Sequence, residues 1–205
     1  SSDEARLITH RLIATFADMI DSDFSQDVAL YDGLLIHIKP LINRLNYQIR
    51  IRNPLLDDIK GELQDVWRLT QCAVNRVFSG WGEQAVSEDE IGYLTVHFQA
   101  AMERQIARKR VLLVCSTGIG TSHLLKSRIL RAFPEWTIVD VISAANLSQV
   151  LPDNIELIIS TINLPTVTMP VAYVTAFFND ADIKRVTEMV ITEKLHHATS
   201  RVVEI

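Results

Sequence analysis

Hydrophobic residues recur at helical spacing through the first half of the chain. Two stripes repeat at intervals of three or four positions: Leu7, Ile8, Leu12, Ile13, Phe16 and Ile20, then Leu34, Ile38, Leu41, Ile42 and Leu45. This spacing predicts two amphipathic helices. A third helix is expected from just after Asn53-Pro54 through Val77, because proline lacks an amide proton and turns its predecessor away from helical geometry.

A further helix is expected after Gly80-Trp81-Gly82, which ends the third one. Ser87 and Glu90 have the spacing of a capping box, in which each side chain bonds the backbone amide of the other residue. Apolar positions then continue from Ile91 to Phe98. Because no strand pattern interrupts these segments, the first half predicts an all-α helical bundle of four or five helices.

The periodicity changes after residue 110. Short apolar runs at 111–114, 138–142, 157–159 and 171–174 predict strands, and helical patterns occupy 124–133 and a closing stretch that Asp180 is expected to cap. Continuous apolar strands that alternate with helices predict an α/β domain with a mainly parallel four-stranded sheet flanked by helices. We therefore expect a helical domain over 1–108 and an α/β domain over 109–205.

Composition narrows the class of protein. The 205 residues are 48% hydrophobic and 22% charged, which is typical of one or two globular domains. The net charge of −5 argues against a chain that binds nucleic acid by itself. Cys72 and Cys115 are too few for a disulfide framework, so we expect a reducing compartment, the cytoplasm. No apolar run reaches the length of a membrane span.

Cys115 stands where the first predicted strand gives way to a glycine-containing loop and a helix. The loop consists of Ser116, Thr117, Gly118, Ile119, Gly120, Thr121 and Ser122. Its backbone amides and the following helix N-terminus can surround an anion, and the same field is expected to lower the pKa of the thiol. A lone cysteine at a strand end is more often simply buried. The adjoining loop instead favours a phosphoryl acceptor.

Other loop chemistries fit less well. No Gly-Lys pair is present for a Walker A loop, and His123 stands where a dinucleotide fingerprint has its third glycine. Gly118 replaces the second cysteine of a thioredoxin motif. Thr121 replaces the arginine of a cysteine phosphatase, which leaves that activity as a third alternative only.

The segment from Val111 to Leu125, Val-Leu-Leu-Val-Cys-Ser-Thr-Gly-Ile-Gly-Thr-Ser-His-Leu-Leu, resembles the start of an enzyme IIB domain of the bacterial sugar phosphotransferase system (PTS), close to the galactitol type. The strand end Ile158-Ile159-Ser160-Thr161 is also similar to that family. The resemblance implies that Cys115 accepts a phosphoryl group from an enzyme IIA protein and passes it on.

Two histidines in the helical half share a spacing with arginine. Arg44 follows His37 by seven residues, Arg104 follows His97 by seven, and Glu90 precedes His97 by seven. Seven residues are almost two helical turns, so each set shares one face, and the arginine is expected to act across a neighbouring helix. A phosphorylated imidazole needs such cations and a partner that fixes its tautomer.

Simpler interpretations of these residues stay open. Any one histidine is more often an ordinary surface or core residue. A metal site formed by His37, His97 and Cys72 lacks ligands at short fixed spacing, so we predict no metal and no cofactor.

Three segments of the helical half resemble one PTS regulation domain: 34–44 around His37, the Arg52-Asn-Pro-Leu-Leu segment, and 90–97 ending at His97. In that family two histidines are phosphorylated by the phosphocarrier protein HPr or by enzyme II components, and the domains dimerise. The resemblance therefore implies phosphorylation of His37 and His97, contacts with HPr and enzyme IIA or IIB proteins, and a homodimer.

Both resemblances together are similar to the central part of mannitol-type activators and related antiterminators. They imply a non-enzymatic sensory fragment of a sugar-operon regulator that contacts DNA or RNA only through regions absent here. The alternative is a transport IIB subunit that hands phosphate from Cys115 to an incoming sugar. Docking to a membrane permease component fits either hypothesis.

Overall fold

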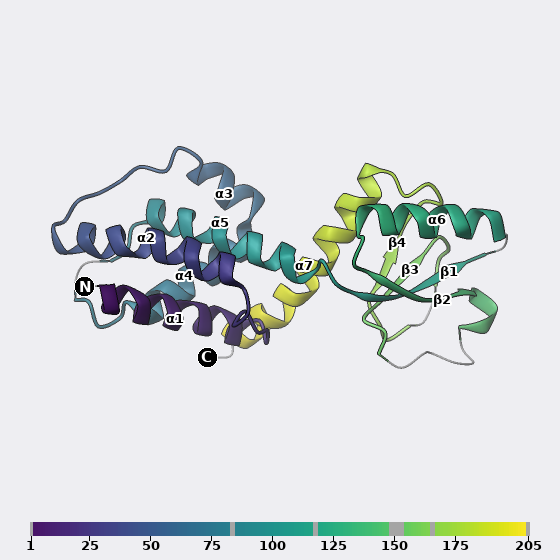
Figure 1. Cartoon of the computed structure of the whole chain (residues 1–205), viewed down its shortest axis with the longest axis horizontal. Helices are drawn as coiled ribbons and strands as arrows, with labels where there is room; N and C mark the ends of the chain where they lie inside the picture. The colour runs from purple at the N-terminus through teal and green to yellow at the C-terminus, as the bar shows by residue number, and fades with distance from the viewer. Residues whose placement is uncertain (1, 83–84, 117–118, 148–153, 165–166, 204–205) are drawn as a thin grey trace. The chain divides into compact units, whose positions relative to one another are not determined.

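The computed structural model describes residues 2–82, 85–116, 119–147, 154–164 and 167–203 (Figure 1). Contacts divide the chain into two units, Ser1–Glu103 with Thr192–Ile205, and Arg104–Ile191. The expected domain ranges 1–108 and 109–205 stay a prediction.

The described residues up to Gln105 form five helices, within the four or five that the hydrophobic spacing predicts. They are α1 (Ser2–Met19), α2 (Val28–Asn46), α3 (Leu56–Glu62), α4 (Gln64–Val77) and α5 (Glu88–Gln105). Helix α1 contacts both α2 and α4. The Phe16 and Phe98 rings stack at 4.1 Å, and Leu12, Leu34 and Leu94 are fully buried in the same unit. This apolar interior fixes how α2 and α5 face each other.

Two local expectations in this unit are wrong. The third expected helix is two helices, because the chain breaks at Leu63, where φ is −118° and ψ is 40°. Gly61 in the last turn of α3 weakens helical propensity just before the break. Only one of the two hydrogen bonds of the predicted capping box forms. The Ser87 hydroxyl accepts from the Glu90 amide at 3.4 Å, but the Glu90 carboxylate reaches across to α2.

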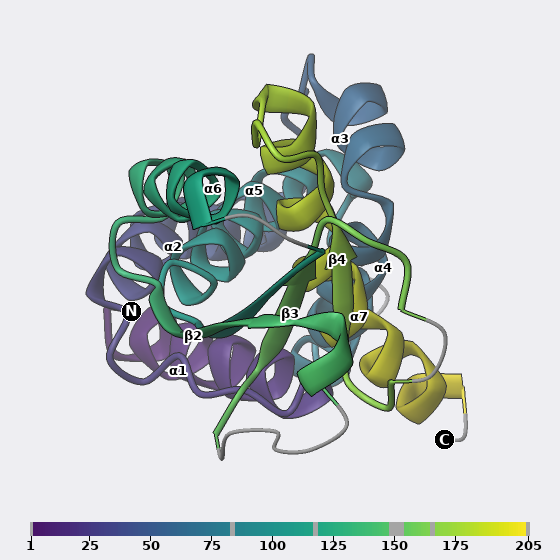
Figure 2. The same ribbon diagram turned by 90° about the vertical axis from the view of Figure 1, so that its right-hand side faces the viewer.

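The second unit is built on a four-stranded sheet in the order β2-β1-β3-β4, with every pair parallel. Its elements are β1 (Arg110–Cys115), α6 (Ile119–Ala132), β2 (Thr137–Ser143), the short η1 (Ala144–Asn146), β3 (Leu157–Ser160), β4 (Val171–Tyr173) and the beginning of α7 (Asp180–Val203). This confirms the expected α/β class. Figure 2 shows α6 and the beginning of α7 on the same side of the sheet.

Strand β1 lies between β2 and β3, and its buried apolar side chains pack on both faces of the sheet. Leu112 and Val114 join Ile158 and Leu164 in one core cluster, and since strand side chains alternate, Leu113 and Cys115 point to the opposite face. The expected cap of the closing helix is corrected by one residue. Asn179, rather than Asp180, accepts from the Asp182 amide at 3.0 Å, because its side chain stands just outside the first turn.

Asp182 anchors the turn that precedes α7. Its carboxylate is fully buried and accepts from the Thr175 hydroxyl and from the Asn179 and Thr175 amides, and the Arg185 guanidinium also contacts it. Burial raises the pKa of Asp182, but these hydrogen bonds outweigh that effect and the net pKa is lowered. The turn between β4 and α7 is thereby fixed at the carboxyl edge of the sheet.

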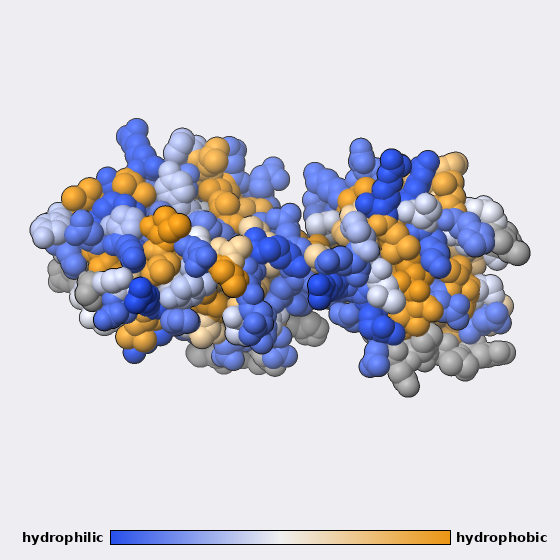
Figure 3. All heavy atoms as spheres, viewed as in Figure 1, coloured by the Kyte–Doolittle hydropathy of each residue, from blue (hydrophilic) through white to orange (hydrophobic). Residues whose placement is uncertain are grey.

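Hydrophilic and hydrophobic residues are interspersed on the face shown in Figure 3. Among the described residues, no helix is both long enough and apolar enough to cross a bilayer.

Candidate functional site

His37, Arg44 and Glu90 form one hydrogen-bonded cluster between α2 and α5. His37 Nε2 lies 2.8 Å from Glu90 Oε2. Arg44 Nε donates to Glu90 Oε1 at 2.6 Å, and Arg44 Nη2 donates to Oε2 at 3.0 Å. The sequence pattern assigned Glu90 to the stripe of His97. The structure instead places Glu90 with His37 and Arg44, so Arg44, on the same helix as His37, reaches a residue of the neighbouring helix α5.

The electrostatics of the cluster favour an ionised Glu90. Only 4% of Glu90 is exposed, and this burial raises the pKa of its carboxyl. Hydrogen bonds from His37 and Arg44, together with the positive charge of Arg44, outweigh the burial, so the net pKa of Glu90 is lowered. Glu90 is therefore a carboxylate at neutral pH, and it accepts hydrogen bonds from both partners.

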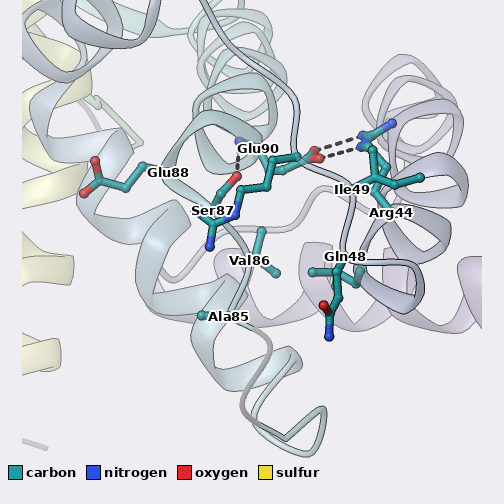
Figure 4. Close-up of a pocket in the computed structure, with 10 residues that line it drawn as sticks. Arg44, Gln48, Ile49, Ala85, Val86, Ser87, Glu88 and Glu90 are labelled. Atoms are coloured by element: carbon teal, nitrogen blue, oxygen red, sulfur yellow. Dashed lines mark hydrogen bonds and ion pairs between the residues drawn. The ribbon is translucent and has the colours of Figure 1, made fainter.

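A pocket of about 550 Å³ opens beside the pair formed by Arg44 and Glu90. The end of α2 lines one side and the segment 85–88 the other, and Figure 4 shows Arg44 and Glu90 facing each other at this pocket. Arg50 also lines it. The Arg44 guanidinium therefore borders open space as well as its carboxylate partner.

Asn53 is a positioning residue that sequence reasoning used only as a helix interruption and as part of a resemblance. Its backbone amide donates to Asp89 Oδ1 at 2.8 Å, and its side-chain Nδ2 donates to the Asp89 carbonyl at 3.3 Å. A Cβ on Gly92 would lie 2.7 Å from Asn53 Nδ2. The 5% exposed Asn53 is thus seated against the first turn of α5, beside Glu90.

Tyr93 was also missed. Its ring centroid lies 5.4 Å from that of His37, and its hydroxyl donates to the Arg52 carbonyl at 3.1 Å. One aromatic side chain therefore contacts the imidazole and the loop before Pro54. A tyrosine three residues after a glutamate on a helix is a signal that could have placed it on the same face.

His97 is on α5, seven residues after Glu90, and it contacts α2 at a different position from the His37 cluster. A Cβ on Gly33 would come within 2.7 Å of His97 Nδ1 and 2.8 Å of its Cε1, so the ring is seated against the α2 backbone one turn before His37. Glu90, seven residues before His97, is engaged with His37 and Arg44 instead. Arg104 is exposed near the end of α5.

Cys115 ends β1, between β2 and β3. The residue is 7% exposed, and burial raises the pKa of its thiol. A hydrogen bond with the Thr161 side chain opposes this effect without cancelling it, so the net pKa is raised. The expected lowering is wrong, because removal of the sulfur from water penalises the thiolate. The Thr161 amide donates to the Val114 carbonyl at 3.1 Å, which places this residue beside the thiol.

The loop after Cys115 is described in part. Thr117 and Gly118 lie outside the described residues, as does the side chain of Ile119. Ser116, Gly120 and Thr121 are exposed and Ser122 is half-buried. Helix α6 begins at Ile119, so a helix N-terminus does follow the cysteine. The chain leaves β1 toward β2 on one side and returns as β3 on the other, and this is the switch point where open α/β sheets bind ligands.

The metal-site alternative involves His37, His97 and Cys72. Within the parts of the chain that the structure describes, no group of three or more histidine, cysteine, aspartate or glutamate side chains could hold an ion.

Comparisons with known proteins match each half of the chain to a protein family. The family model described as the PRD domain matches residues 10–101, and the model described as the PTS system lactose/cellobiose-specific IIB subunit matches residues 110–194. The chain combines a PRD domain with a PTS IIB domain. The matched model concerns lactose/cellobiose subunits, whereas the Cys115 loop resembles the galactitol type.

Two curated relatives from Bacillus subtilis (strain 168) extend over both domains. The transcriptional regulator ManR is 31% identical over 192 residues, which cover 89% of this chain and 29% of ManR. The probable licABCH operon regulator is 31% identical over 175 residues, which cover 82% of this chain and 27% of that protein. The chain thus spans less than a third of each relative. Both relatives are named as regulators.

Proposed function

We propose that this chain is the sensory part of a cytoplasmic bacterial sugar-operon regulator, in which phosphoryl groups received from the PTS at His37 or His97 and at Cys115 set regulatory activity. The observation that carries the proposal is the cluster of His37, Glu90 and Arg44. It combines a nucleophilic imidazole, a carboxylate that fixes its orientation and a cation that borders a pocket.

The cluster supplies a physical switch. A phosphoryl group on His37 adds about −1.5 to −2 charges close to the buried Glu90 carboxylate. Like charges repel, and the Arg44 guanidinium gains a second anion to pair with. The two hydrogen bonds between Arg44 of α2 and Glu90 of α5 are then redistributed, and a two-state change in how these helices contact each other follows.

The partners follow from this proposal. HPr and enzyme IIA or IIB proteins are the phosphoryl donors and acceptors, and a second copy of the chain forms a homodimer. DNA or RNA is contacted by regions outside this chain. Phosphotransfer serves regulation here, so the protein is not an enzyme. Cys115 receives its group at the carboxyl edge of the sheet, where Thr161 bonds its sulfur.

The test is intact mass after incubation with phosphoenolpyruvate, enzyme I, HPr and candidate enzyme IIA proteins. Wild type is compared with His37→Ala, His97→Ala and Cys115→Ala. His10→Ala is the matched control, because His10 is an exposed histidine of α1 in the same unit. We expect one phosphoryl increment to disappear with Cys115 and another with a histidine of α2 or α5. Unmodified protein with every donor would overturn the proposal.

The transport alternative is tested separately. A IIB subunit would support sugar phosphorylation by membranes that contain a partner permease, and Cys115→Ala would abolish that activity. A regulator gives no such sugar phosphate while still accepting phosphoryl groups itself.

A further inference from the structure

We propose that the phosphoryl group on His37 is carried by Nδ1, and that Glu90 is the positioning residue that leaves this nitrogen as the nucleophile. The inference rests on the proposed function, since it requires that His37 be phosphorylated. It adds the identity of the reacting atom and the reason for it.

His37 Nε2 and Glu90 Oε2 lie 2.8 Å apart, within hydrogen-bonding distance. Glu90 is ionised and also accepts two bonds from Arg44, so its oxygens only accept. Nε2 must therefore carry the hydrogen. A neutral imidazole holds one N–H and one lone pair, which leaves the lone pair on Nδ1. Within the described chain, His37 makes no second hydrogen bond, and its ring also contacts the Tyr93 ring.

Reaction at Nε2 is disfavoured by the same contact. A phosphoryl group there would replace the hydrogen that Glu90 accepts and bring a dianion against a carboxylate that is 4% exposed. Like charges at that separation repel strongly where little water screens them. Phosphorylation at Nδ1 keeps the bond to Glu90 intact.

The transfer step balances without any proton movement. The Nδ1 lone pair attacks the phosphorus of the donor's phosphohistidine, an N–P bond forms, and the donor's N–P bond breaks with its electron pair returning to the donor nitrogen. His37 keeps its Nε2 hydrogen, and its ring becomes cationic. The Glu90 carboxylate faces that N–H, so it stabilises the charge that develops during transfer.

At His97, in contrast, Nδ1 is the ring nitrogen that lies against a neighbouring helix. The space at its Nδ1 is filled by the α2 backbone, because even a methyl carbon on Gly33 would lie 2.7 Å away. A phosphoryl group is larger than a methyl group, so it does not fit on Nδ1 of His97 while α2 holds this position.

The first experiment needs no donor. In full-length protein labelled with ¹⁵N-histidine, long-range ¹H–¹⁵N correlation reports which ring nitrogen of His37 bears the proton. We expect the Nε2–H tautomer in wild type and loss of that preference in Glu90→Gln. Glu103→Gln is the matched control, because Glu103 is an exposed glutamate of the same helix that does not line the pocket. An Nδ1–H tautomer in wild type would overturn the inference.

The second experiment identifies the product. Full-length His97→Ala is phosphorylated by HPr, and separately by the small donor phosphoramidate, and ³¹P–¹⁵N coupling then locates the phosphorus. We expect the Nδ1 isomer, formed about a hundredfold more slowly in Glu90→Gln than in Glu103→Gln. The Nε2 isomer would overturn the inference and leave the proposed function standing. No modification of His37 by HPr or by phosphoramidate would overturn both for this residue.

Discussion

Arg44 and Glu90 are joined by two parallel N–H···O hydrogen bonds, of 2.6 and 3.0 Å, across the interface of α2 and α5. Such a bidentate pair fixes both the distance and the rotation of the two side chains. It therefore links the helix that carries His37 to the helix that carries His97.

Removal of the guanidinium is expected to weaken the helical domain. Arg44→Ala leaves the Glu90 carboxylate buried without its cation, and we expect a loss of about 3 kcal/mol in the free energy of unfolding. Denaturant unfolding of the full chain measures it. Lys60→Ala breaks the exposed pair with Glu88 and should cost less than about 1 kcal/mol. Equal losses of unfolding free energy in Arg44→Ala and Lys60→Ala would contradict the interpretation that burial makes the Arg44–Glu90 pair the stronger one.

Acid is expected to remove the contribution of Glu90. Its pKa is lowered in the folded protein, so its ionised form stabilises the fold at pH values above the ordinary carboxyl pKa, and this stabilisation is lost as the pH falls through the lowered value. Calorimetry of wild type and Glu90→Gln should therefore show a difference in Tm at neutral pH that shrinks toward pH 3. A difference that is constant with pH would refute the ionised carboxylate.

Two helical glycines are expected to respond oppositely to the same substitution. Gly33→Ala places a methyl group 2.7 Å from His97 Nδ1, so the ring must move, at a cost of about 1–3 kcal/mol and with reduced phosphorylation of His97. Gly61→Ala in α3 meets no atom within 4 Å and should stabilise the fold by about 0.5–1 kcal/mol. Thermal unfolding and the phosphoryl mass increment test both. The idea fails if Gly33→Ala leaves phosphorylation of His97 unchanged.

Thr161 is expected to control the reactivity of Cys115. Thr161→Val removes the hydrogen bond that lowers the thiol pKa, and a bond worth about 1 kcal/mol corresponds to a roughly fivefold smaller thiolate fraction. Iodoacetamide alkylation at pH 8, in a Cys72→Ser background, should slow by that factor. Thr161→Ser keeps the hydroxyl and should react like the parent. An unchanged rate in Thr161→Val would exclude this role.

Periodicity alone predicted the larger features of the fold. The spacing from Leu7 to Ile20 and from Leu34 to Leu45 corresponds to α1 and α2, and each apolar run in the second half became a strand. These patterns are strong because one face of every element must be buried. The break at Leu63 was missed, because the apolar spacing continues through it and only Gly61 marks a weak point.

The candidate site was predictable in its members and less so in its geometry. Spacing along one helix shows that Glu90 and His97 share a face, but it does not reveal which residue of another helix lies opposite. The partnership of Glu90 with His37 and Arg44 depends on how α2 and α5 pack. The pKa of Cys115 was misjudged for a similar reason, since its burial between two strands is a tertiary property.

The burial of Cys115 also determines how the protein meets oxidants. Peroxide reacts with thiolates that are accessible, and Cys115 is 7% exposed with a raised pKa. We expect its sulfur to stay reduced at peroxide levels that convert exposed, acidic thiols to sulfenic acid. The phosphoryl signal that we propose for this cysteine would thereby be protected from oxidative stress.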